Sequence, residues 1–93
     1  MVDIIAEALV DQWPRDKQKM EQALADSDLI PVLHVAHALK GTVAMFGARP
    51  AVELAQRVEL LAERGDTIGM PELIDALNAE VNQLVVALLR SLP

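Results

Sequence analysis

The sequence has neither cysteine nor tyrosine, and its 93 residues include one tryptophan and one phenylalanine. Without cysteine the chain forms no disulfide, thiolate metal site or thiol nucleophile. Bases are also scarce: eight of them stand against fourteen acids, for a net charge of −6 and a pI near 4.7. This balance argues against binding to nucleic acid or to anionic membranes, since both require a basic face. Apart from carboxylates and a few lysines, the groups left for chemistry are two histidines, two serines and two threonines.

Length and hydropathy predict one domain over residues 1–93, because so short a chain rarely buries two separate cores. A hydrophobic fraction of 53% is too high for a disordered chain. Charged residues interrupt every stretch of about twenty residues, so we expect no membrane-spanning helix. The first residues carry acids where a signal peptide carries bases, and this favours a cytoplasmic location.

Prolines and glycines divide the chain at intervals of about one helix. Between them stand strong helix formers, and no stretch alternates with the period of two that a strand requires. The fold class predicted is therefore all-α. Prolines fall near the starts of apolar segments and glycines near their ends, and these residues are Pro14, Pro31, Pro50 and Pro71, then Gly47, Gly65 and Gly69.

Apolar residues recur at helical spacing in five segments. The four longer ones predict an antiparallel four-helix bundle, and the first predicts a short additional N-terminal helix that caps one end. The expected helices cover approximately 3–12, 14–25, 28–46, 50–64 and 70–91.

The segment over residues 28–46 differs from the other four in its charge. No acid occurs from Leu29 to Ala48, and Lys40 is the only base there. His37 follows the core position Ala36, so it points about 100° away from the core. The residues around it on that face are small and uncharged. An exposed, weakly apolar patch of this kind usually marks a docking site for another protein.

His37, Lys40 and Gly41 together suggest phosphoryl transfer. Neutral imidazole is a nucleophile near neutral pH, because histidine ordinarily titrates near 6.5. A cation one turn away would stabilise the phosphoryl oxygens. Gly41 costs about 1 kcal/mol relative to alanine inside a helix, and two explanations remain open. It permits either a close helix crossing or the approach of a bulky phosphodonor.

The run A-H-A-L-K-G-T-V-A-M-F-G-A, residues 36–48, resembles the histidine-containing phosphotransfer (HPt) domain. The signature of that family is H-x-L-K-G with a further glycine six residues later. Residues 54–66 are similar to the family's next helix, and residues 23–29 to the turn before its active helix. The positions of the signature are occupied by His37, Leu39, Lys40, Gly41 and Gly47.

The resemblance implies a phosphorelay intermediate of two-component signal transduction, not a kinase. His37 would accept a phosphoryl group from the aspartyl phosphate of a response-regulator receiver domain and pass it to another receiver. Lys40 would stabilise the phosphoryl charge and Gly41 would leave access open. Glu59, together with Gln56, would orient the imidazole through its second nitrogen. No cofactor or metal is expected in this chain, and Mg²⁺ would belong to the receiver.

Receiver docking is expected around the active helix and on the first helix. His34 lacks the lysine and glycine in register, so we interpret it as a rim residue of the docking surface or as ordinary surface packing. The residues expected to contact the partner are His34, Ala38, Ala44, Met45, Ala48, Ile4 and Ala8, with Val35 close to them.

Two alternatives of other classes accompany this interpretation. One is a metal-binding bundle that uses His34 and His37, whose spacing suits helical ligands, although Lys40 would repel the cation. The other is an adaptor or structural bundle in which His37 is inert. We expect a monomer, either free-standing or as the C-terminal module of a hybrid sensor histidine kinase.

Overall fold

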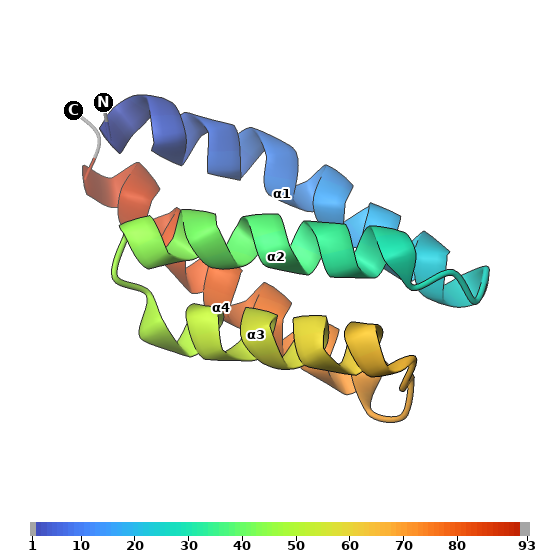
Figure 1. Cartoon of the computed structure of the whole chain (residues 1–93). Coiled ribbons are helices and arrows are strands. Elements are labelled where there is room, and N and C mark those ends of the chain that lie inside the picture. The colour runs from blue at the N-terminus through green and yellow to red at the C-terminus, as the bar shows by residue number, and fades with distance from the viewer. Residues whose placement is uncertain (1, 92–93) are drawn as a thin grey trace.

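The computed structural model describes residues 2–91 of the chain, with the side chains of residues 4–90. Over that range it contains four helices and no strand, which confirms the all-α fold class. Successive helices run antiparallel, so the beginning of the first and the end of the last lie at the same end of the bundle (Figure 1). The helices are α1 (Val2–Ala25), α2 (Ile30–Met45), α3 (Arg49–Arg64) and α4 (Met70–Ser91).

The N-terminal part of the chain is one helix, and the prediction of a separate short helix over 3–12 was wrong. Helix α1 runs without a break through Pro14. A proline inside a helix lacks the N–H for one backbone hydrogen bond and crowds the preceding turn, at a cost of about 3 kcal/mol. Proline is therefore normally found in the first turn of a helix, and for this reason the sequence predicted a helix start at Pro14.

Tertiary packing explains why the helix continues past this proline. Leu9, Trp13 and Met20 are all buried in the core, so both halves of α1 are held against the rest of the bundle. The Trp13 indole also donates a hydrogen bond of 2.9 Å to the side-chain oxygen of Asn78 on α4. Pro14 itself lies on the exposed side, where water can reach the carbonyl that lost its partner.

The other helix boundaries agree closely with the predicted ones. The three later prolines stand in the first turns of α2, α3 and α4, where a missing N–H costs nothing. Gly65 ends α3 with a φ of +68°, and the N–H of Asp66 donates to the carbonyl of Leu61. This is the left-handed ending that favours glycine. Gly69, predicted to end a helix, instead lies just before the start of α4.

Each helix packs against two neighbours, in the order α1, α2, α3, α4 and back to α1, and α2 with α3 is the closest pair. The buried face of α3 explains that closeness, because it consists mainly of small side chains: Ala51, Ala55 and Ala62 beside Val58. Small side chains let two helix backbones approach each other. Leu54 and Leu61 of the same helix are only half-buried and pack at the edge of the core. Between residues 2 and 91 no helix has the length and hydropathy needed to cross a membrane.

Candidate functional site

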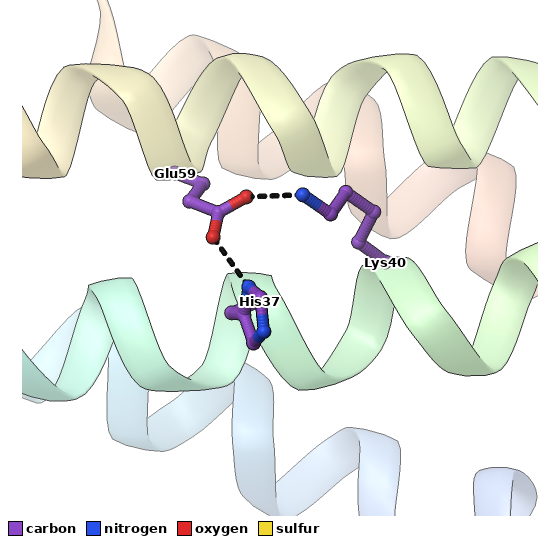
Figure 2. Close-up of polar contacts among 3 residues, drawn as sticks. All are labelled: His37, Lys40 and Glu59. Atoms are coloured by element: carbon purple, nitrogen blue, oxygen red, sulfur yellow. Dashed lines mark hydrogen bonds and ion pairs between the residues drawn. The ribbon is translucent and has the colours of Figure 1, made fainter.

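The candidate site joins three side chains from the two helices that pack most closely. His37 and Lys40 lie one turn apart on α2, and Glu59 reaches toward them from α3 (Figure 2). One oxygen of Glu59, Oε2, lies 2.6 Å from Nδ1 of His37. The other, Oε1, accepts a hydrogen bond of 2.7 Å from the Lys40 ammonium. A single carboxylate therefore holds both the histidine and the lysine.

The three side chains differ sharply in their exposure to solvent. The side chain of Glu59 is 10% exposed and that of Lys40 31%, whereas that of His37 is 71% exposed. Glu59 lies on the buried face of α3, three residues before Ala62 and four after Ala55. The imidazole of His37 consequently lies at the surface, and the nearly buried Glu59 carboxylate holds it in place.

Electrostatics keep the Glu59 carboxylate ionised. The Lys40 ammonium, through its hydrogen bond, lowers the pKa of Glu59 below its ordinary value of 4.5; burial opposes this effect, and the hydrogen bond with His37 adds to the lowering. An ionised carboxylate can only accept hydrogen bonds, so the proton in the contact with His37 must sit on Nδ1. The lone pair of the neutral ring is then on Nε2, on the side of the ring away from Glu59 (Figure 2).

The surface beyond His37 is open, as its small residues suggested. Gly41 follows one turn later, and a Cβ placed on it would have no protein atom within 4 Å. This excludes the explanation that Gly41 permits a close helix crossing. Ala38 and Ala44 are exposed on the same helix. Apart from Lys40, which is bound to Glu59, the positions on α2 around His37 named here carry no side chain larger than a methyl group.

A shallow groove between α1 and α2 runs beside this open surface, with a volume of about 330 Å³. Three of the residues predicted to contact a partner line it: Ile4, Ala8 and Ala38. Ile4 is 70% exposed, which is unusual for an isoleucine. The structure therefore places these predicted contact residues together, on the α1 side of His37.

Of the other predicted contact residues, Met45 is 66% exposed at the end of α2, Ala44 is exposed and Ala48 is half-buried. Val35 does not belong to the surface as expected, since it is 7% exposed and packs in the core. His34 is exposed and lines a second shallow cavity of about 430 Å³ with Lys19 and Asp16 of α1.

Gln56 was predicted to help orient the imidazole, but the structure does not bring it to His37. Its side chain is exposed, and among the described residues no hydrogen bond joins it to the ring. Among the residues whose side chains the structure describes, Nδ1 forms its hydrogen bond with Glu59. In the same part of the chain, no three histidine, cysteine, aspartate or glutamate side chains gather to hold a metal ion.

The contact between Lys40 and Glu59 was not foreseen from the sequence. The family resemblance implied that Glu59 reaches His37 from 22 residues away, but not that the same carboxylate also binds Lys40. One signal for it was present. An acid at position 59 falls within the apolar spacing of Ala55, Val58 and Ala62, where a charged side chain is buried only if it has partners.

Comparison with protein families shows the class of the molecule. The model of the Hpt domain family matches residues 5–87, nearly the whole chain. The chain therefore belongs to the Hpt domain family, whose members are phosphotransfer carriers of two-component phosphorelays, not kinases, and interact with the receiver domains of response regulators. Comparisons with curated proteins and with solved structures gave no significant match.

Proposed function

We propose that this chain carries phosphoryl groups between receiver domains and that Nε2 of His37 is the atom that carries them. The observation behind this proposal is the hydrogen bond between Nδ1 of His37 and the ionised Glu59. It leaves the lone pair of Nε2 on the side of the ring away from Glu59 (Figure 2), on a side chain that is 71% exposed and one turn before the open position of Gly41. A nucleophile that must meet a large partner needs this combination of fixed orientation and open access.

In the proposed reaction, Nε2 attacks the phosphorus of an aspartyl phosphate on the receiver. A phosphorus–nitrogen bond forms, the phosphorus–oxygen bond breaks, and its electron pair returns to the receiver's carboxylate. The reverse sequence on a second receiver passes the group on. The chain supplies no kinase chemistry, and the Mg²⁺ that assists transfer belongs to the receiver.

Lys40 is proposed to stabilise the phosphoryl charge from its place one turn after His37. Before transfer its ammonium is bound to Oε1 of Glu59 at 2.7 Å. An incoming phosphoryl group carries more negative charge than one carboxylate, so the ammonium would turn toward it or be shared between the two. Lys40 is 31% exposed and so has room for this movement.

The proposed docking surface is the groove between α1 and α2 together with the small residues of α2. Ile4 and Met45 are its large exposed apolar side chains, and apolar anchors of this kind commonly carry most of the binding energy. The expected monomer, the single domain over residues 1–93, the cytoplasmic location and the link to a hybrid sensor histidine kinase stay predictions from the sequence.

Transfer from a receiver tests the proposal. Receiver domains from the source organism, loaded with radiolabelled phosphate, are incubated with the wild-type chain and with His37→Gln and His34→Gln. We expect label that is stable to alkali and labile to acid in the wild type and in His34→Gln, which retains His37, and none in His37→Gln. Uptake of label by His37→Gln would overturn the assignment. Failure of every receiver to label the wild type would favour the adaptor with an inert histidine.

A further inference from the structure

The contact between Glu59 and His37 involves a full negative charge as well as a hydrogen bond. The two atoms are 2.6 Å apart, and the carboxylate has only 10% of its side chain exposed. Charge-assisted hydrogen bonds of this kind are about twice as strong as neutral ones. A neutral amide in the same place could accept the same hydrogen bond from Nδ1, so the negative charge is what distinguishes the carboxylate from an amide at this position.

We propose that Glu59 is a positioning residue whose charge keeps the proton on Nδ1 of phosphorylated His37 up to a higher pH, so that below that pH the ring leaves as neutral imidazole. This inference rests on the proposed function, in which Nε2 of His37 carries the phosphoryl group. It assigns Glu59 an electrostatic effect on onward transfer, in addition to holding the ring in place.

The charge balance of the transfer step gives the reason. When Nε2 bonds to phosphorus while Nδ1 keeps its proton, the ring becomes cationic, and the Glu59 carboxylate lies against that positive charge. When the phosphorus–nitrogen bond breaks, its electron pair returns to Nε2 and neutral imidazole is released. If Nδ1 had lost its proton, the leaving group would be an imidazolate anion, which leaves far less readily. No proton has to move during transfer in either direction.

Titratable groups are also present near His37 on its own helix and on the two helices beside it. On α2 these are Lys40 and His34; on α1, Asp16 and Lys19 line the cavity that also includes His34 and Ala38. On α3, Glu63 lies one turn beyond Glu59 and is exposed. Among the described residues only Glu59 makes a hydrogen bond or ion pair with His37. The effect is therefore assigned to that carboxylate and not to the general charge of the surface.

Phosphorus NMR of the phosphorylated chain tests the inference without a receiver. In a His34→Gln background, which leaves His37 as the only histidine, the chain is phosphorylated with potassium phosphoramidate. The phosphorus resonance is then followed against pH, since it shifts when Nδ1 loses its proton. The same titration is made with Glu59→Gln and with Glu63→Gln. The first keeps an acceptor for Nδ1 but removes the charge, and the second is the matched control on the same helix.

We expect the midpoint of the pH titration in Glu59→Gln to lie about one pH unit below that of the background chain, a shift typical of an ion pair near the surface. The midpoint in Glu63→Gln should equal that of the background chain. Equal midpoints in Glu59→Gln and the background chain would overturn the inference, as would an equal fall in Glu63→Gln. A second measurement needs no substitution of Glu59. When urea unfolds the phosphorylated background chain, Glu59 is no longer held against the ring, so the pH midpoint of the phosphorus resonance should fall. An unchanged or higher pH midpoint would contradict the inference.

The two proposals fail in different ways. If a receiver labels His37 but the midpoint does not depend on Glu59, the carrier function stands and the electrostatic effect does not. If Glu59→Gln lowers the midpoint but no receiver labels His37, the local charge effect is real and the carrier function is wrong. Onward transfer gives the kinetic counterpart: its rate should decline at a lower pH in Glu59→Gln than in the wild type.

Discussion

Replacing Gly41 by alanine should make the protein more stable. Gly41 lies in the interior of α2, and a Cβ added there would have no protein atom within 4 Å. The substitution therefore introduces no clash, and it removes the entropic cost of glycine in a helix. That cost is about 1 kcal/mol relative to alanine. For a domain of this size, such a gain raises the unfolding midpoint by about 4–8 °C.

The matched control is Gly65→Ala, the same chemical change at the end of α3. A Cβ on Gly65 would also have no neighbour within 4 Å, but Gly65 has a φ of +68°. Alanine is strained in this left-handed conformation by about 1–2 kcal/mol, so this variant should unfold at a lower temperature than the wild type. Thermal unfolding followed by circular dichroism measures both variants. The difference between them isolates the backbone, because neither added methyl group touches another side chain.

The functional half of the same prediction concerns access to His37. Gly41→Leu should also keep the fold, yet it should slow transfer from a phosphorylated receiver, because the leucine side chain stands on the surface over which the partner approaches. Transfer at the wild-type rate in Gly41→Leu would refute the argument that glycine provides access. A lower unfolding temperature in Gly41→Ala would refute the prediction of increased stability, because it would mean that the added methyl group clashes with other atoms at Gly41.

Two further predictions concern the charged groups of the site. Lys40→Ala should slow phosphoryl transfer. It should also lower the free energy of unfolding by about 1–3 kcal/mol, because the nearly buried Glu59 loses one of its two partners. Urea unfolding measures this loss, and an unfolding midpoint equal to that of the wild type would contradict the prediction. Because the pKa of Glu59 is lowered in the folded state, its charge stabilises the protein above pH 4.5, and this contribution is lost as pH falls through and below that value. The difference in stability between the wild type and Glu59→Gln should therefore shrink in acid, and a constant difference would show that the lowered pKa does not act on folding.

Much of the fold was predictable because its signals are local. Proline in a first turn, glycine after a last turn and apolar spacing of three and four depend on neighbouring residues only. They predicted α2, α3 and α4 within a residue or two. Pro14 is where such reasoning failed. A proline inside a helix does carry a local cost, but the burial of Leu9, Trp13 and Met20 along the whole of α1 outweighs it.

The residues of the candidate site were predictable to different degrees for the same reason. His37, Lys40 and Gly41 lie within five residues of one another, so the helical repeat alone places them on one side of α2. The expected contributions of Glu59 and Gln56 looked alike in the sequence. Glu59 is buried against His37 and Lys40, whereas Gln56 remains exposed. The two positions differ by about 60° around the helix axis, so the way in which α3 packs against α2 decides which of them faces the histidine.

By itself, the sequence determined that this protein is a helical bundle with an exposed histidine on a helix that carries no acid. Both properties follow from the helical period and from composition. Only the tertiary structure decided which nitrogen of that histidine is held by a hydrogen bond and which is left with its lone pair. That choice depends on a carboxylate 22 residues away, and the small side chains of α3 bring it within hydrogen-bond distance because they let two helices pack closely. Contacts between helices depend on their relative rotation and separation, which no local pattern specifies.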